Sequence, residues 1–390
     1  MRIGFFTNTY LPINYGSTVS VETFRKSLEK LGEEVFVFAP QYEDYDDKNE
    51  SVFRYPSIMY NYKGKYPIAI PFYPPINKKI KELKLDIIHA HQPFSLGREG
   101  LRLAKKHSIP IIFTHHTRYE DYVHYVPMLP ESVLANLVKK EATRFANQCD
   151  LVIAPSESIK QMIISRGVKT QVKVLPTGIE ADKFQSGRRK KIRKKFHIEE
   201  SENLLLNVGR IEEEKNISFL FECAAGIMKK NKKTKLMFVG GGSLKETIKE
   251  KAAKMKIKNR VIFAGLVDRE EIQDYFAAGD VYLQASTSET QGLSLYEAMA
   301  SGLPCVAVES TGSMDAVDSG KDGILVKENK KQFQSAVEDL IQDGSKRKRL
   351  SKEAAKKARK NDVVHQAKKL QQYYWKVIQE KQLKKKFAPL

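Results

Sequence analysis

Residues 280–302 have the sequence DVYLQASTSETQGLSLYEAMASG and contain, in order, a short apolar segment, a polar loop and a helical pattern. The segment Asp280–Gln284 is typical of a buried strand, and residues 285–292 are polar without a regular period. The helical pattern covers Leu293–Ala300 and ends at Gly302. A buried strand followed by a loop and a helix is the repeating unit of a parallel sheet that helices cover on both faces.

Units of this kind recur along the whole chain in two series. The first series has strand patterns at Arg2–Thr7, Val35–Ala39, Asp86–His91, Pro110–His115, Leu151–Ala154 and Val172–Leu175. The second has them at Leu204–Val208, Lys235–Val239, Val261–Ala264, Asp280–Gln284, Pro304–Val308 and Ile324–Val326. Helical patterns lie between the strands. The sequence therefore predicts an α/β fold with two doubly wound, Rossmann-like domains that face each other across a cleft.

The two series meet in residues 176–186, and 390 residues suit two domains of this size. We expect an N-terminal domain over residues 1–180 and a C-terminal domain over residues 181–369. The last helix, at about residues 370–390, has one apolar face made by Leu370, Tyr373, Tyr374, Val377 and Ile378. We expect this helix to pack back onto the N-terminal domain.

The composition is that of a soluble protein with an excess of basic residues. No apolar run reaches the roughly 20 residues of a membrane span, and the three distant cysteines fit neither a disulfide framework nor a zinc site, which favours the cytoplasm. Of the net charge of +20, +15 lies in residues 187–390, where 42 Lys and Arg face 27 Asp and Glu. A basic surface of this kind either is solvated or binds polyanions. Because no nucleic-acid-reading motif is visible, we expect little nucleic-acid binding at physiological salt.

The loop at residues 285–292 and the helix after it form the strongest candidate site. The backbone N–H groups of Gly292, Leu293 and Ser294 begin the helix, and with the helix dipole they suit the binding of a diphosphate. Glu289 and Glu297 flank this position and could bind the hydroxyl groups of a sugar and a ribose. The structural alternative makes Glu289 a capping residue and Glu297 a solvated helix residue.

A second candidate site follows the strand Leu204–Val208, in NVGRIEEEKN at residues 207–216. Arg210 and Lys215 could neutralise a departing diphosphate, because Arg binds two oxygens at once and Lys acts as a point charge. The alternative is two exposed cations among the 67 of the chain.

Histidines follow a strand of the first series, in FTHHTRY at residues 113–119. Strand alternation puts His115 and His116 on opposite faces, so only one of them should face the cleft. A hydrogen-bonded core histidine is the alternative for either. His89 and His91 lie at another strand end, but the acidic residues that would complete a metal shell with His116 are not evident nearby. We therefore expect no metal site.

The segment SETQGLSLYEAMASGLP at residues 288–304 resembles the signature of the retaining GT-B enzymes of glycosyltransferase family 4. The resemblance extends over nearly the whole chain and implies a metal-independent, retaining transfer from a nucleotide sugar, with no resident cofactor. The catalytic residues that it implies are His116, Arg210, Lys215 and Glu289. The donor-binding residues that it implies are Gly16, Gly209, Leu266, Val267, Gln291, Gly292, Leu293, Ser294 and Glu297.

The resemblance also assigns roles within this set. It implies that Glu289 and His116 contact the donor sugar, that Glu297 binds the ribose, and that Arg210 and Lys215 contact the diphosphate. The backbone at Leu266 and Val267 would hold the base. The family usually has two glycines where this chain has Tyr15-Gly16, and the alternative there is a plain strand–helix turn in which Ser17 or Thr18 caps the helix. The run Gly240–Gly242 lacks a dinucleotide spacing and is interpreted as structural.

Two segments of the N-terminal half interleave aromatic and basic residues, Tyr60–Pro74 and Arg118–Pro127. Such a mixture suits the headgroup boundary of a membrane. The stretch His116–Tyr125 resembles the family's subgroup that transfers glucose to diacylglycerol. The alternative is that these aromatics are ordinary core and loop residues. The acceptor or membrane candidates are Tyr62, Lys63, Lys65, Tyr66, Arg118, Tyr119 and Tyr122. The basic run Arg188–Lys195 either touches a membrane or is solvated.

We therefore expect an enzyme that moves a hexose, in the first place glucose from UDP-glucose, onto 1,2-diacylglycerol at the cytoplasmic face of the cell membrane. Other donors (UDP-galactose, UDP-GlcNAc or GDP-mannose) and a soluble acceptor remain open. A nucleotide-sugar 2-epimerase has the same architecture, and a basic nucleic-acid-binding protein is the alternative from another class.

Overall fold

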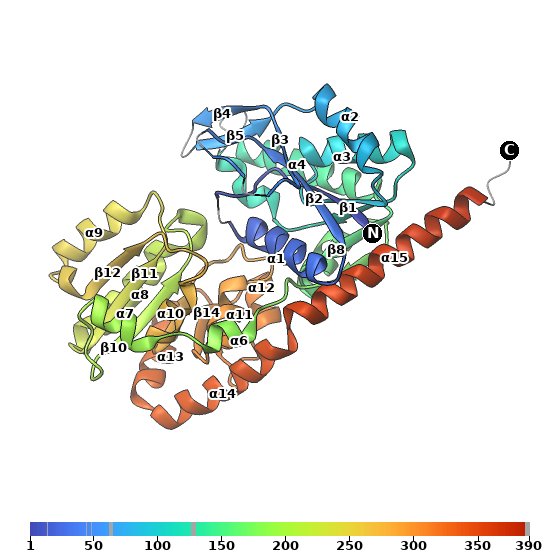
Figure 1. Ribbon diagram of the computed structural model, residues 1–390. Helices are drawn as coiled ribbons and strands as arrows, with labels where there is room; N and C mark the ends of the chain where they lie inside the picture. The colour runs from blue at the N-terminus through green and yellow to red at the C-terminus, as the bar shows by residue number, and fades with distance from the viewer. Residues whose placement is uncertain (14, 44, 48, 62–64, 126–129, 387–390) are drawn as a thin grey trace. The chain divides into compact units, whose positions relative to one another are not determined.

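The structure is a computed structural model that describes residues 1–386 except 14, 44, 48, 62–64 and 126–129. The chain forms two compact units (Figure 1). The first unit contains Met1–Gly178 together with Val363–Leu390, and the second contains Ile179–Asp362. The last helix, α15 (Val363–Lys386), begins earlier than the sequence suggests, and it belongs to the first unit.

The first unit is built on a sheet of seven parallel strands in the order β3-β2-β1-β6-β7-β8-β9. The strands are β1 (Arg2–Phe6), β2 (Glu34–Pro40), β3 (Val52–Tyr55), β6 (Ile87–Ala90), β7 (Ile111–Thr114), β8 (Leu151–Ala154) and β9 (Val172–Val174). The strand order reverses between β1 and β6, which is the mark of a doubly wound sheet.

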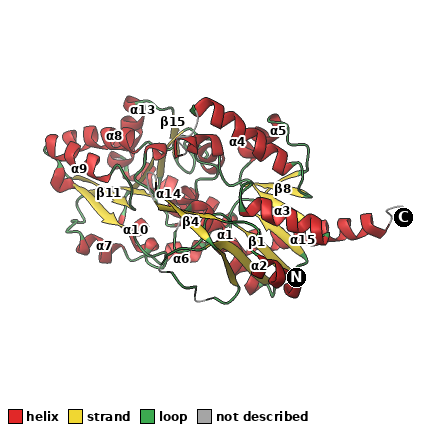
Figure 2. Cartoon of the chain, turned by 90° about the horizontal axis from the view of Figure 1, so that it is seen from above, coloured by secondary structure: helices red, strands yellow, loops and turns green. Residues whose placement is uncertain are grey.

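Successive residues of β1 point to opposite sides of this sheet, and helices cover both sides. Ile3 and Phe5 pack with α1 (Gly16–Lys30) and α15. Phe6 packs in a second cluster with α2 (Pro74–Leu83), α3 (Leu96–His107), α4 (Glu131–Ala146) and α5 (Glu157–Ser165). In Figure 2 the helices are red and the strands yellow.

Three strands of the first unit were not predicted. β3 is an edge strand and is mostly half-buried, whereas β4 (Ser57–Asn61) and β5 (Lys65–Ala69) form a separate antiparallel hairpin. In β5 the small residue Ala69 is buried while Ile68 is exposed. These strands therefore lack the continuous buried apolar run that identified the others.

The second unit has six parallel strands in the order β12-β11-β10-β13-β14-β15, with the reversal between β10 and β13. The strands are β10 (Asn203–Val208), β11 (Thr234–Val239), β12 (Val261–Gly265), β13 (Val281–Gln284), β14 (Cys305–Val308) and β15 (Ile324–Val326). Each overlaps a segment expected from the sequence. The prediction of two doubly wound, Rossmann-like α/β domains is confirmed.

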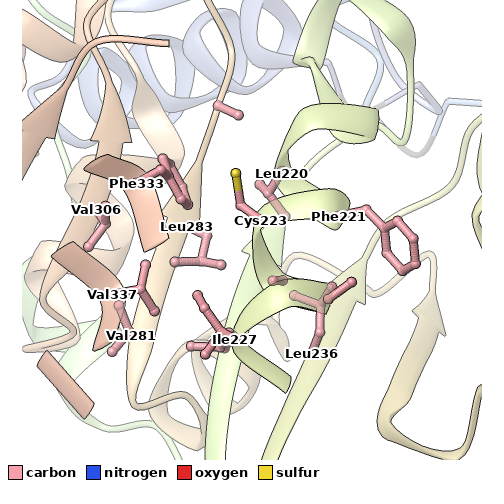
Figure 3. Packing of buried hydrophobic residues seen from close by; sticks show 14 of the residues in the cluster. Leu220, Phe221, Cys223, Ile227, Leu236, Val281, Leu283, Val306, Phe333 and Val337 are labelled. Carbon is pink, nitrogen blue, oxygen red and sulfur yellow. The ribbon is translucent and has the colours of Figure 1, made fainter. Parts of the chain in front are cut away.

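Helices also cover both faces of the second sheet. On one face, Leu220 and Phe221 of α8 (Ile217–Lys230) pack in the same buried cluster as Leu283 of β13 and Phe333 of α13 (Lys330–Gln342) (Figure 3). The other face is covered by α6 (Ala181–Gln185), α7 (Arg189–Lys195), α10 (Ile272–Ala278), α11 (Leu293–Ala300), α12 (Thr311–Ala316) and α14 (Gly344–Lys360). The remaining short elements are η1 (Tyr119–Tyr125), η2 (Glu213–Lys215), α9 (Lys245–Lys254) and η3 (Lys258–Arg260).

Most of the basic run Arg188–Lys195 is exposed, as its solvated alternative predicts, but some of its cations are paired. It folds as α7 against α10, where Arg188 and Lys191 form ion pairs of 2.9 and 3.1 Å with the buried Asp274. Arg193 is only 1% exposed, and its guanidinium donates to backbone carbonyls. Several cations of this run are therefore neutralised within the second unit.

No helix in the described part of the chain combines the length and the apolar character that a membrane span requires.

The packing of α15 can be tested with two leucines of that helix. Leu370 is fully buried, whereas Leu383 is 55% exposed. Leu370→Ala should lower the free energy of unfolding of the first unit by about 2–5 kcal/mol, because it leaves a cavity in the core. Leu383→Ala should change it by less than about 0.5 kcal/mol. The single tryptophan, Trp375, lies on α15, so its fluorescence during urea unfolding reports this unit. Equal midpoints for the two variants would contradict the packing.

Candidate functional site

The predicted site residues of the second unit lie at the reversal of its strand order. One loop follows β10 and the other follows β13, which are neighbours in the sheet but are succeeded by helices on opposite faces. In doubly wound sheets, ligands bind at this place, outside the carboxyl ends of the strands. Arg210 and Lys215 lie in the first loop, and Glu289 lies in the second.

An ion pair joins the two loops. Lys215 Nζ lies 2.5 Å from Glu289 Oε1. The same loops are also connected by hydroxyl groups, since the Oγ atoms of Ser286 and Ser288 donate to the carbonyl of Glu214 at 3.3 and 3.1 Å. The structure thus brings Lys215 and Glu289 together, and in a direct contact that the sequence did not predict.

The environment of Glu289 favours its ionised form. Burial by itself would raise the pKa of this carboxyl. Lys215, the hydroxyl of Ser286 and the charge of Arg210 outweigh burial, so the pKa lies below its ordinary value. Glu289 is therefore a carboxylate at neutral pH, with oxygens that can accept hydrogen bonds from hydroxyl groups.

Arg210 is held at the base of the same loop by an ion pair with Glu214, whose side chain is 4% exposed. The turn that carries Arg210 leans against the glycine run after β11. The backbone N–H of Ile211 donates to Gly241 O at 2.8 Å, and a Cβ on Gly240 would lie 2.0 Å from Gly209 O. This contact explains a structural role for the run Gly240–Gly242, because residues without a side chain let its backbone approach the turn at Gly209 closely.

The start of α11 has the geometry of an anion-binding site. Gly292 precedes the helix with φ of 75°, a left-handed conformation that suits glycine, and no side chain caps the helix. The first N–H groups, at Leu293 and Ser294, therefore lack an acceptor in the preceding turn. The alternative of Glu289 as a capping residue is wrong.

The loop before α11 also contacts the start of α12. Gly312 at the start of α12 donates its N–H to Glu289 O at 2.8 Å, and a Cβ on Gly312 would lie 2.8 Å from the nitrogen of Gln291. Gln291 itself is 6% exposed. The backbone at Glu289 and Gln291 is thus held by contacts with α12.

Glu297 is not a solvated helix residue, which corrects the structural alternative for it. Its side chain is only 5% exposed and forms an ion pair with Arg269, which follows β12. The Arg269 guanidinium also lies over the ring of Phe184, 5.5 Å from its centre. Burial would lower the pKa of Arg269, but Glu297 outweighs it and raises the pKa, so the guanidinium stays charged. Sequence reasoning missed Arg269, because no spacing relates it to Glu297.

The other predicted donor-binding positions differ in their exposure and packing. Leu266, after β12, is 89% exposed, whereas Val267 packs against a core cluster of the second unit. Gly16 is the first residue of α1, and nothing lies within 4 Å of a Cβ built there. Tyr15 is the N-cap of that helix, and no side chain of the described residues caps it, so the suggestion that Ser17 or Thr18 does so is wrong.

The two adjacent histidines of the first unit have different surroundings. His115 is 4% exposed, and its ring packs edge-on against Phe113 and Tyr119. His116 is partly exposed, and its Nε2 lies 2.9 Å from Nδ1 of His91. Burial lowers the pKa of His115 to about 4 and that of His116 to about 3, so both rings are neutral at physiological pH.

Only some of the predicted acceptor residues lie within the part of the chain that the structure describes. Tyr62 and Lys63 lie outside the described residues, and Lys65 begins β5. Tyr66 and Tyr122 are half-buried. Tyr119 packs edge-on against Phe94 as well as His115, and Arg118 forms an ion pair of 3.2 Å with Asp121. Among the described residues, no group of three or more His, Cys, Asp or Glu side chains is arranged to hold a metal ion.

The close approach between Gly240 and the carbonyl of Gly209, next to Arg210, can be tested. Gly240 has φ of 139°, which strains any other residue, and a methyl group there would collide with the backbone. Gly240→Ala should speed amide hydrogen exchange in the turn at residues 209–211 by at least about 10-fold, since such a conformation costs about 1–3 kcal/mol. Gly241→Ala is the matched control, because its methyl group would meet only ordinary contacts with Leu266. Equal exchange in both variants would contradict the supporting role.

Known proteins similar to this chain were found in three comparisons. The family model described as Glycosyltransferase Family 4 matches residues 15–183, and that described as Glycosyl transferases group 1 matches residues 188–357. An alpha-monoglucosyldiacylglycerol synthase of Streptococcus pneumoniae is 37% identical over 79% of this chain and 71% of its own length. An enzyme of the same name from Acholeplasma laidlawii is 34% identical over 84% of this chain and 85% of its own length.

Solved structures show the same fold. A sucrose-phosphate synthase from Thermosynechococcus elongatus aligns with a TM-score of 0.80 at 19% identity, over 97% of this chain and 99% of its own. HepE of Anabaena in complex with UDP-glucose aligns with a TM-score of 0.77 at 18% identity, over 96% of this chain and 99% of its own. With family models matching both halves and relatives above 30% identity over most of its length, the chain belongs to glycosyltransferase family 4, and it is a glycosyltransferase with the GT-B fold.

Proposed function

We propose that this glycosyltransferase transfers one glucose from UDP-glucose to 1,2-diacylglycerol at a membrane surface. The observation that carries this proposal is the similarity, through both units, to two enzymes named alpha-monoglucosyldiacylglycerol synthase. A further relative, at 29% identity over 87% of the chain, is the sulfoquinovosyl transferase SQD2 of Arabidopsis thaliana.

The same similarity supports a retaining stereochemistry of the transfer. The glucose of UDP-glucose is α-linked, and the relatives' name describes an α-linked product, so their configuration would be retained. In the reaction we propose, the bond from the anomeric carbon to the diphosphate breaks, and the acceptor oxygen bonds to the same face. The proton of the acceptor hydroxyl passes to the departing UDP, whose oxygen lies on that face.

The Lys215–Glu289 pair supplies the chemistry of the donor site. Lys215 would stabilise the charge that develops on the departing diphosphate, together with Arg210 and the N–H groups at the start of α11. Glu289, held ionised, would accept hydrogen bonds from sugar hydroxyls. Because the two side chains already contact each other, little reorganisation is needed when the donor binds. These cations supply positive charge at the diphosphate, which supports a transfer without a metal ion.

The donor-site roles predict a selective loss of turnover. Lys215→Ala and Glu289→Ala should each lower kcat by at least ~100-fold, the scale of one lost transition-state contact. Lys230→Ala is the matched control: it breaks an ion pair of 2.9 Å with Glu338 on the surface of the same unit and should leave kcat unchanged. The assay follows glucose transfer from UDP-glucose to diacylglycerol in vesicles with chelator present, and NMR assigns the anomer formed.

The panel of substrates decides between the alternatives. UDP-galactose, UDP-GlcNAc and GDP-mannose test the donor, and soluble sugars test the acceptor. A sugar epimerised without any acceptor would contradict transfer. Near-normal kcat in both site variants would refute the assignment of Lys215 and Glu289.

An exposed apolar patch in the first unit supports action at a membrane. We define it by Ile58, Ile68, Ile70, Phe72 and Tyr73, whose exposed fractions are 66%, 53%, 47%, 64% and 37%. Ile58 and Ile68 are direct cross-strand partners in the β4–β5 hairpin. Large apolar residues exposed together on one segment are unusual for a soluble surface.

Basic residues follow the patch along the chain. The exposed face of α2 carries Lys78, Lys79 and Lys81, and the Arg102 guanidinium lies 4.8 Å from the centre of the Phe72 ring. Apolar residues that enter the headgroup region and lysines that face anionic lipids act together at membrane surfaces. We propose this patch as the membrane-facing surface of a peripheral enzyme.

The patch makes a prediction that is independent of catalysis. The double variant Ile68→Ser and Phe72→Ser should weaken binding to anionic phospholipid vesicles by at least about 10-fold, because two side chains that would enter the lipid are lost. Ile164→Ser is the control, since Ile164 of α5 is 43% exposed in the same unit but lies outside the patch. Equal loss of binding in a vesicle sedimentation assay would contradict the patch.

A further inference from the structure

The backbone of His116 donates to the carbonyl of Thr114 at the end of β7, and its ring contacts a second histidine. His91 directly follows β6, and His116 lies two residues beyond the end of the neighbouring strand β7. Nδ1 of His91 lies 2.9 Å from Nε2 of His116, and the two rings are nearly parallel, with centres 5.2 Å apart and planes inclined by 22°. The ring of His116 is therefore in direct contact with His91 through one nitrogen and one face.

His91 is in turn fixed by its surroundings. Its side chain is fully buried, and the ring of His89 stacks on it with centres 4.3 Å apart. The ring of Phe5 meets His91 edge-on. His89 is anchored at both nitrogens, by Tyr374 of α15 at 2.6 Å and by Thr114 at 2.7 Å. A continuous set of contacts therefore leads from α15 to His116.

The hydrogen bond between His91 and His116 contains one proton, because both rings are neutral. Burial lowers the pKa of His91 far below its ordinary value and that of His116 to about 3. A neutral imidazole carries one N–H, so one ring donates and the other accepts.

The other nitrogen of His91 decides which ring donates. Its Nε2 is buried, and among the described residues it has no hydrogen-bond partner. A proton on Nε2 would be a buried N–H without an acceptor, which costs about 1–3 kcal/mol. A proton on Nδ1 is used in the bond to His116 and leaves only a lone pair at Nε2. The second arrangement is the more stable one.

We propose that His91 is a positioning residue, which donates its Nδ1–H to Nε2 of His116 and thereby fixes the proton of His116 on Nδ1. With its proton on Nδ1, His116 can act at that nitrogen only as a hydrogen-bond donor. This role rests on the proposed function, since it is the donor sugar that His116 would contact.

The tautomer can be measured without any activity. In ¹⁵N-histidine-labelled protein, the two ring nitrogens of His116, assigned by comparison with a His116→Gln variant, distinguish the protonated from the unprotonated position. We expect the proton on Nδ1 at neutral pH. A proton on Nε2 in the wild-type protein overturns the proposal.

Two substitutions of nearly equal size separate hydrogen bonding from packing. His91→Asn keeps an N–H donor near the position of Nδ1, whereas His91→Leu removes it. We expect His91→Leu to lower kcat by about 10- to 100-fold with little change in KM, the scale of a misplaced catalytic group, and His91→Asn to recover most of that loss. Equal kcat in the two folded variants overturns the proposal, because a purely structural role predicts it. If His91→Leu does not fold, the wild-type tautomer and the activity of His91→Asn decide the matter.

The two proposals fail differently. If the chain does not transfer glucose to diacylglycerol, the wild-type enzyme lacks that activity while the tautomer of His116 is still as inferred. If His91 has no positioning role, the wild-type enzyme is active but the tautomer or the pair of variants contradicts the assignment.

Discussion

The reversal of strand order between β10 and β13 is the constraint on which the proposed donor site depends. The helices that follow these neighbouring strands pack on opposite faces, so the two loops separate and leave backbone exposed at the sheet edge. The ion pair between Lys215 and Glu289 connects the loops at this place. Burial would raise the pKa of Glu289, but the charge of Lys215 outweighs it, so this carboxylate stays ionised.

The second unit repeats this pairing of a shielded carboxylate with a cation from another element. Glu297 pairs with Arg269, and Asp274 pairs with Arg188 and Lys191. A buried carboxylate without a partner would be protonated or would destabilise the fold. The high basic charge of residues 187–390 is therefore partly used inside the unit, and a charge count overestimates the basic surface that it offers to polyanions.

The sequence predicted the features that follow from local chemistry. Buried parallel strands have continuous apolar runs, so the main strands could be located, and the helix Leu293–Ala300 was predicted to the residue. Because loops after parallel strands gather at one sheet edge, Arg210, Lys215 and Glu289 could be grouped in advance. Their roles toward a donor stay predictions.

Features that depend on tertiary contacts could not be predicted. Arg269 meets Glu297 only because the loop after β12 and the helix α11 come together in the folded unit, and His91 meets His116 only because β6 and β7 are neighbours. The β4–β5 hairpin was missed because its large apolar residues are exposed, which reverses the usual pattern of a strand. These features depend on which segments come together in the folded chain, and a short stretch of sequence does not reveal that.

The return of α15 to the first unit has a consequence for the order of synthesis. Leu370, Tyr374 and Val377 complete the layer of side chains that also contains Ile3 and Phe5 of β1. One side of the first sheet therefore stays partly uncovered on the ribosome until residues beyond 370 have emerged. The second unit, whose residues run without interruption from 179 to 362, has all of its strands available before that moment. The half that is translated first is thus the last to be completed.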